Sequence, residues 1–262
     1  GTLLDDGLAR YLSRTGRVSF ISVSLDGSTP EVHEALRVVP GCFDAAVDGI
    51  RALVRAEYRP QMICTLHRGN AVQMGDVIAL AERLGCGSVK FNHVQSSGRG
   101  EQFASEEGLG VAEVLALYRA LERELLPKAQ IPVYFDLPVA FHSIRRLLQD
   151  PLGSCQVLNI LGMLAGGELA LCGIGTTVPD LIYGHIARDD LRTVWCQAPG
   201  LAHLRALIPA QLDGVCGQCL HRDTCLGTCV ANNYHETGRL NAAYRFCADA
   251  EALGLFPASR RR

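Results

Sequence analysis

The sequence lacks most of the features that would assign a function by themselves. No apolar run approaches the roughly 20 residues that a membrane-spanning helix needs. Acidic and basic residues are nearly balanced, 27 against 25, so charge gives no reason to expect a nucleic acid or an anionic membrane as partner. The glycine-bearing segment 96–100 has no G-K-[ST] and is not a phosphate loop. No secretory signal is visible, and because the chain opens without methionine we expect its natural start to lie upstream.

Cysteine, in contrast, is abundant and ordered. Seven of the eleven cysteines form one series, whose dense part has the spacing C-x2-C-x5-C-x3-C. A thiolate is a soft, charged ligand that suits iron–sulfur clusters, zinc or Cu(I), and close spacing lets one loop supply several ligands. The series therefore predicts a metal centre built from Cys155, Cys172, Cys216, Cys219, Cys225, Cys229 and Cys247.

Three chemistries compete for these thiols. Disulfides need an oxidising compartment and are densest in small secreted domains, which a chain of 262 residues is not. Structural zinc takes four ligands per ion, so seven cysteines would need a histidine such as His221 or His235. Iron–sulfur clusters, in which an open coordination position is natural, are the expectation, and they favour a reducing cytoplasm. Outside the series, Cys64 and Cys86 fit the role of small buried apolar residues.

Strand-like and helix-like segments alternate over the first half of the chain. Runs rich in β-branched and apolar residues predict buried parallel strands at 18–25, 59–66 and 88–94. Amphipathic segments predict helices at 43–56, 71–84 and 110–126, and Thr29-Pro30 predicts a further helix start. This alternation of predicted strands and helices indicates an α/β fold with βα units around a parallel sheet.

Polar residues gather where the predicted strands end. The carboxyl ends of parallel strands meet at one edge of a sheet, where ligands bind in α/β folds. Taken singly, each of these residues is as consistent with a solvated loop as with a binding site. The residues are Ser24, Asp26, His67, Arg68, Asn70, Asn92, His93 and Gln95.

The alternation of strand-like and helix-like segments ends after residue 150. The segment 151–154 marks a boundary, and short apolar segments on either side of Ala165-Gly166-Gly167 predict a β-hairpin. Short helices are expected at 189–195 and 201–207, before the cysteine loop. We therefore expect two domains, residues 1–150 and residues 151–262.

With Gly167 included, the cysteine series resembles the signature of the SPASM domain, C-x(9–15)-G-x4-C followed by C-x2-C-x5-C-x3-C and a last cysteine. Eleven residues separate Cys155 from Gly167, and seventeen separate Cys229 from Cys247. The SPASM domain is the auxiliary-cluster extension of radical S-adenosylmethionine (SAM) peptide-modifying enzymes. Residues 1–100 resemble the second half of the radical SAM core, chiefly through segments 24–27 and 33–44. Segment 171–180 resembles maturases of SynChlorMet-type cassettes.

The resemblance implies the second half of a partial (β/α) radical SAM barrel, followed by a small cysteine-rich SPASM domain with a β-hairpin and short helices. It implies up to two auxiliary 4Fe–4S clusters with interleaved ligands. The first would be held by Cys155, Cys172 and Cys229, which leaves one iron open. The second would be held by Cys216, Cys219, Cys225 and Cys247. Ser24 and Arg37 match positions near SAM, although Arg37 is equally consistent with a surface ion pair to a helix carboxylate.

The resemblance also implies an activity. A complete family member generates a 5′-deoxyadenosyl radical from SAM to abstract hydrogen from a precursor peptide, using a reductant such as ferredoxin or flavodoxin. The family's C-x3-C-x2-C motif, which binds the SAM-cleaving cluster, does not occur in these 262 residues. Val38 and Glu57 stand where the family often has glycine, which should weaken a helix end at Glu57. The alternative function is a non-catalytic iron–sulfur or zinc scaffold that binds a peptide or protein partner.

Overall fold

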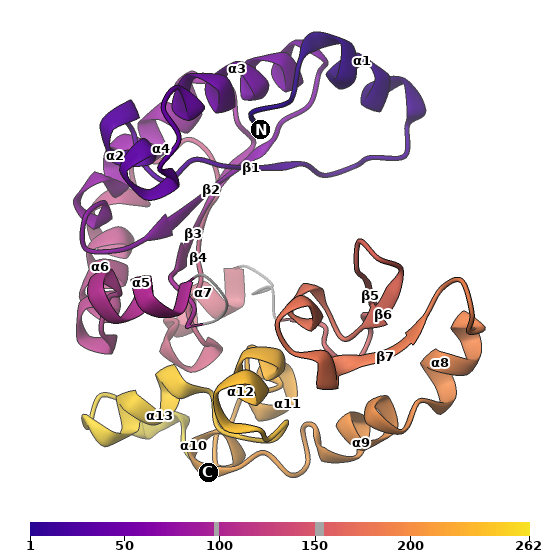
Figure 1. The fold of residues 1–262 in the computed structure, drawn as a ribbon. Coiled ribbons are helices and arrows are strands. Elements are labelled where there is room, and N and C mark those ends of the chain that lie inside the picture. Colours follow the sequence, from indigo (N-terminus) through magenta and orange to yellow (C-terminus); the bar gives the residue numbers. More distant parts are fainter. Residues whose placement is uncertain (97–99, 150–154) are drawn as a thin grey trace. The chain divides into compact units, whose positions relative to one another are not determined.

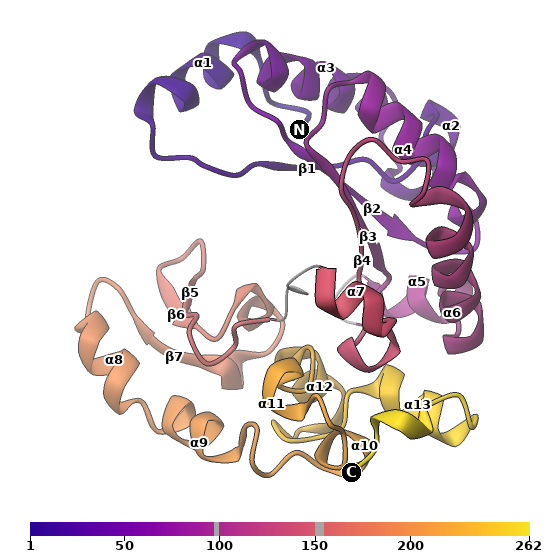
Figure 2. The same ribbon diagram turned by 180° about the vertical axis from the view of Figure 1, so that it is seen from behind.

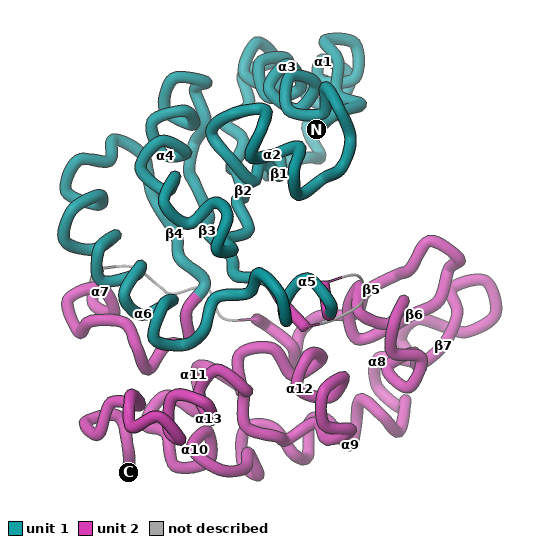
Figure 3. The backbone as a smooth tube through the Cα atoms, turned by 60° about the vertical axis from the view of Figure 1, so that its left-hand side comes forward, with its two compact units in different colours: residues 1–94, 102–136 teal, residues 95–101, 137–262 magenta. Residues whose placement is uncertain are grey.

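The computed structural model describes residues 1–96, 100–149 and 155–262. The chain forms two compact units, residues 1–94 with 102–136, and residues 95–101 with 137–262 (Figure 3). The boundary expected after residue 150 and part of segment 96–100 lie outside the described residues, so the division into 1–150 and 151–262 stays a prediction. Within the described ranges, no helix is both long enough and apolar enough to cross a membrane.

A four-stranded parallel sheet forms the centre of the first unit. Its strands lie in the order β1 (Ser22–Ser24), β2 (Gln61–Leu66), β3 (Ser88–His93) and β4 (Val133–Phe135). The sheet is open, with β1 and β4 at its edges (Figure 1). This confirms the α/β fold with a parallel sheet, which the alternation of strand-like and helix-like segments predicts.

Helices α2, α3, α4 and α6 lie along one face of this sheet (Figures 1 and 2). Strand residues that alternate toward them, such as Val23, Cys64 and Phe91, are at most 1% exposed. Ser24 and Thr65, on the other face, are more accessible. The helices of this part of the chain are α1 (Asp6–Thr15), α2 (Pro30–Arg37), α3 (Cys42–Arg55), α4 (Met74–Arg83), α5 (Gly100–Glu107) and α6 (Val111–Ala120), with a π-helical turn at Leu121–Leu125 and a 3-10 turn at Ala71–Gln73.

The second unit is built from short elements. An antiparallel sheet of β5 (Gly162–Met163), β6 (Glu168–Ala170) and β7 (Ile182–His185) contains the expected hairpin, and Gly167 turns it with a φ of 98°. The helices are α7 (Ile144–Gln149), α8 (Leu191–Gln197), α9 (Pro199–Leu207), α10 (Gly214–Gly217), α11 (Arg222–Cys225), α12 (Val230–Thr237) and α13 (Arg245–Ala252). Single 3-10 turns lie at Val139–Phe141, Gly173–Thr176, Pro179–Leu181 and Ala258–Arg260. The short helices expected near 189–195 and 201–207 are confirmed as α8 and α9.

The strand expected over 18–25 is shorter in the structure, where β1 covers Ser22–Ser24. β1 is an edge strand that pairs with β2 alone, so its first residues lack the second neighbour that would hold them in a ladder. The expectation that Cys64 and Cys86 are buried is confirmed, because each is 1% exposed.

Two helices end on a side chain in the left-handed conformation. Val38 is the C-cap of α2 with a φ of 55°, and Glu57 lies just beyond α3 with a φ of 67°. These are the positions at which the resembled family often has glycine. A residue with a Cβ costs about 1–2 kcal/mol in this conformation, and a β-branched residue fits it worst.

We expect Val38→Gly to raise the free energy of unfolding by about 1 kcal/mol, because glycine removes the strain. Little burial is lost, since Val38 is 81% exposed. Urea denaturation followed by circular dichroism measures the change. The matched control is Val72→Gly, at a valine that is 90% exposed and has no positive φ. The control should lose stability, and equal losses in both variants would contradict strain at Val38.

Candidate metal centre and sheet edge

Four of the seven predicted ligands line one cavity in the second unit. Cys216 lies on α10, Cys219 follows that helix, Cys225 ends α11 and Cys247 lies on α13. This is the set that the resemblance assigns to the second cluster, and its role as ligands stays a prediction. The apolar part of the wall comes from Pro138, Ala140, Leu212 and Phe256.

Hydrogen-bond donors are directed at the sulfurs of this cavity. The N–H of His221 donates to Cys219 Sγ at 3.4 Å, and the N–H of Tyr244 donates to Cys216 Sγ at 3.4 Å. A mutual hydrogen bond lowers the pKa of Cys216 and raises the pKa of its partner Cys247. Donors to sulfur favour the charged thiolate, which is the form that binds a metal. Burial nevertheless raises the pKa of Cys219, so these donors offset only part of the cost of holding negative sulfur in this cavity.

The loop between Cys225 and Cys229 has a strained backbone. Leu226, Gly227 and Thr228 are all left-handed, with φ values of 54°, 78° and 59°. Only glycine adopts this conformation readily, and such strain concentrates at functional sites. The turn lets Cys225 line the cavity while Cys229, at the other end of the loop, is not among the lining residues.

The other three predicted ligands lie on different elements. Cys155 and Cys172 are close together: burial raises the pKa of Cys155, and the charge of Cys172 adds to the rise. Cys229 is the N-cap of α12. That helix is joined to the 3-10 turn Pro179–Leu181, the second such turn after Cys172, by a hydrogen bond of 3.0 Å from Tyr234 Oη to Asp180 Oδ2. The structure brings Cys155 and Cys172 together and ties the helix that begins at Cys229 to the same region.

The alternatives to iron–sulfur clusters can be compared with this geometry. All eleven cysteines are free thiols, so the structure gives the disulfide alternative no support. For zinc, His221 lies inside the cysteine loop, and its buried Nε2 has no hydrogen-bond partner within the described ranges, whereas His235 lies on α12. Across the described ranges, no three His, Cys, Asp or Glu side chains are placed to hold a single metal ion.

At the carboxyl edge of the parallel sheet, Asp26 is the centre of a buried network. It is fully buried. Its Oδ1 accepts from the N–H of Thr65 at 2.9 Å, and its Oδ2 accepts from the Arg37 guanidinium at 2.8 and 2.6 Å. Asn70 Nδ2 donates to the carbonyls of Asp26 and Thr65 at 2.9 Å each, while its Oδ1 accepts from the N–H of His67 at 2.8 Å. The ends of β1 and β2 are thereby joined.

The two predicted SAM contacts lie beside this network. Ser24 is exposed at the end of β1. Arg37 pairs with Asp26, a carboxylate of the sheet edge and not of a helix, and its side chain is still 43% exposed. Contact with SAM stays a prediction for both residues. From the sequence, Asp26 and Asn70 were predicted only as polar residues at strand ends. No periodic pattern in the sequence indicates the hydrogen bond between them.

His67 presents an unpaired donor at the same edge. Its Nδ1 accepts from the N–H of Gly69 at 3.2 Å, so the proton of the neutral ring belongs on Nε2, which is buried and has no hydrogen-bond partner among the described residues. Burial lowers the pKa of His67 and keeps the ring neutral. On the neighbouring strand, the Oδ1 of Asn92 is also buried and accepts no hydrogen bond from the part of the chain that the structure describes. A donor and an acceptor without partners indicate that this edge can receive a polar ligand.

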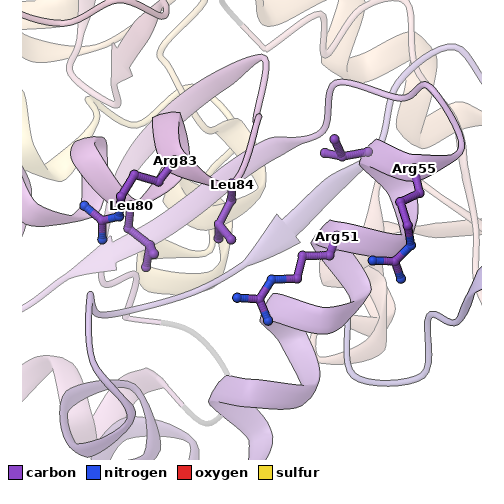
Figure 4. Close-up of a pocket in the computed structure, with 6 residues that line it drawn as sticks. Arg51, Arg55, Leu80, Arg83 and Leu84 are labelled. Atoms are coloured by element: carbon purple, nitrogen blue, oxygen red, sulfur yellow. The ribbon is translucent and has the colours of Figure 1, made fainter.

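A separate pocket of about 450 Å³ lies between α3 and α4 (Figure 4). Two of its guanidinium groups are already paired, Arg51 with Asp48 at 2.9 Å and Arg55 with Asp6 at 2.8 Å. It belongs to the helical layer and contains none of the predicted site residues. Its lining residues are Arg51, Val54, Arg55, Leu80, Arg83 and Leu84.

Comparison with known proteins gives the chain its relatives, although no family model matches it. It is 27% identical, over 91% of its length, to the AdoMet-dependent heme synthase of Methanosarcina barkeri, of which it covers 69%. It is 31% identical, over 82% of its length, to the mycofactocin maturase MftC of Mycobacterium ulcerans, of which it covers 56%. The chain is a homologue of radical SAM enzymes. It spans between about half and 70% of the length of these two relatives.

A solved structure shares the fold. The structure of anSMEcpe with bound AdoMet and a Kp18Cys peptide matches 96% of this chain and 70% of that one, with a TM-score of 0.67 and 13% sequence identity. The radical SAM-type fold expected from the sequence is therefore confirmed.

Proposed function

We propose that this chain is the iron–sulfur-binding part of a radical SAM/SPASM enzyme that modifies a ribosomally made peptide. The observation that carries the proposal is the cavity lined by Cys216, Cys219, Cys225 and Cys247. One homologue is named a maturase, and a structure of the same fold holds AdoMet and a peptide, which supports both as partners. A reductant such as ferredoxin or flavodoxin supplies the electrons. Eleven free cysteines suit a reducing cytoplasm.

The donor set of the cavity fits a 4Fe–4S cluster. Such clusters are held by four cysteine thiolates, with hydrogen bonds to sulfur that set the potential. Three of these cysteines are at most 7% exposed, and two of the sulfurs accept backbone N–H donors. Cys155, Cys172 and Cys229 would supply three ligands to the first cluster and leave one coordination position for another group.

Bound clusters supply one-electron redox chemistry, and SAM supplies the radical that abstracts hydrogen. The residues of this chain would hold and shield these groups. Leu212 and Phe256 line the cavity of the four cysteines and would shield a cluster held there from water. Arg37 is fixed by Asp26, and the exposed part of its guanidinium is available to a carboxylate such as that of SAM. Ser24 adds a hydroxyl at the same sheet edge.

The scaffold alternative differs from the enzyme in one measurable respect. Residues 1–262 hold no C-x3-C-x2-C motif, so we expect the loaded, dithionite-reduced chain to form no 5′-deoxyadenosine above a cluster-free background. Fused to a radical SAM segment that carries this motif, the chain should form it, as measured by chromatography. A fusion with full iron that forms none would favour the scaffold. Product from the chain alone would show that the assigned division of roles is wrong.

A further inference from the structure

The first predicted cluster has three cysteines, and the structure offers a further polar group beside them. Tyr183 lies on β7, in the same unit as Cys155, Cys172 and Cys229. The backbone N–H of Leu171 donates to the carbonyl of Leu181 at 2.9 Å, which sets the residue before Cys172 against the start of β7. Burial raises the pKa of Tyr183, and the charge of Cys172 adds to the rise, which is consistent with the two side chains being neighbours.

The backbone gives Tyr183 a distinct position. Ala170 of β6 pairs with Ile182, but the preceding residue Leu169 pairs with Gly184, so Tyr183 is one extra residue in β7. A β-bulge of this kind re-aims a side chain, and bulges are frequent beside functional sites.

The hydroxyl of Tyr183 has no partner of its own. Its Oη is buried and forms no hydrogen bond within the described part of the chain. The neighbouring Tyr234 differs, because its Oη donates to Asp180 Oδ2 at 3.0 Å. The Tyr183 ring is also held in place, since a Cβ on Gly200 of α9 would lie 2.5 Å from its Cε1. A fixed, buried and unpaired O–H calls for an acceptor that the protein atoms do not supply.

We propose that the Tyr183 hydroxyl donates a hydrogen bond to the first cluster, on its Cys172 side, and raises the reduction potential of that cluster. The proposal rests on the proposed function, because it needs a cluster at Cys155, Cys172 and Cys229. An O–H donor to cluster sulfur stabilises the reduced, more negative state over the oxidised one. Tyr183 is thus a tuning residue of the cluster and not one of its ligands.

The test is a reductive titration of the anaerobically loaded chain, followed by electron paramagnetic resonance. Cys172→Ala identifies the signal of the first cluster by its loss. In Tyr183→Phe we expect this cluster to reduce about tenfold less favourably, a shift of about 59 mV to more negative potential for one electron. Iron content and the second signal should not change.

Two further variants make the test specific. Tyr234→Phe removes a hydroxyl that already has an acceptor, so it should leave the potential unchanged. Gly200→Ala keeps the Tyr183 hydroxyl but pushes its ring aside, so it should shift the potential in the same direction as Tyr183→Phe. Agreement between these two shifts excludes a nonspecific effect of removing the phenol.

The outcomes separate this inference from the proposed function. If Tyr183→Phe binds the full amount of iron and the reduction potential of its first cluster is unchanged, the inference is overturned while the proposed function stands. Loss of about half the iron in Tyr183→Phe would also overturn it, because the phenol would then be an iron ligand. A parent protein without iron would overturn the proposed function and this inference with it.

Discussion

Replacing Cys219 with alanine is expected to remove about half of the iron bound per chain, because each of the two predicted clusters carries four irons. Cys219 lines the cavity with Cys216, Cys225 and Cys247 and is 7% exposed, so no solvent thiol replaces it easily. The first predicted cluster takes none of its ligands from this set. Iron and acid-labile sulfide, determined after anaerobic loading, measure the loss.

The control is Cys196→Ala, at an exposed cysteine of α8 outside the motif, which should retain all the iron. Cys225 and Cys229 test whether the two clusters take their ligands alternately along the chain. They lie at the two ends of the same strained loop but are assigned to different clusters. Cys225→Ala should abolish the same resonance as Cys219→Ala, whereas Cys229→Ala should abolish the other. Loss of one common signal in all three variants would contradict the division into two sets.

Asn70→Ala is expected to lower the free energy of unfolding by about 3 kcal/mol, because each buried group left unpaired costs about 1–3 kcal/mol. Asn70 is 1% exposed, and its side chain satisfies the carbonyls of Asp26 and Thr65 and the N–H of His67. Alanine would leave all three without that partner at the end of β2. Urea denaturation followed by circular dichroism measures the difference.

Asn241 provides the matched control for this prediction. Its Nδ2 also donates to a backbone carbonyl, that of Gln211 at 2.9 Å, but the bond is exposed and water can replace it. Asn241→Ala should therefore cost much less than Asn70→Ala. Similar small losses in both variants would show that the Asn70 network does not hold the sheet edge together.

Periodicity was enough to predict the parallel sheet and most of its helices. The apolar runs that became β2 and β3 and the amphipathic face of α3 are local signals, carried by residues that are neighbours in sequence. The edge strand β1 was predicted too long, because a local pattern cannot show that a strand has a partner on one side only. Helix α5 was not predicted, since it starts in a segment that reads as a glycine-bearing loop.

The sites were predictable in a different way. The grouping of Cys216, Cys219, Cys225 and Cys247 came from resemblance to a family, because spacing alone does not say which thiols face the same cavity. The bond between Asn70 and Asp26, 44 residues apart, depends on the pairing of two strands. Tyr183 depends on one extra residue in β7. Such contacts are set by tertiary structure and leave no periodic trace in the sequence.

The metal content of the anaerobically purified, iron-loaded chain tests the central claim most directly. If both predicted sites hold 4Fe–4S clusters, the protein is brown and contains about eight irons and eight acid-labile sulfides per chain. Iron and sulfide in equal amounts near this value are the predicted result. Zinc bound without sulfide would contradict the account and assign the cysteines to a structural zinc site.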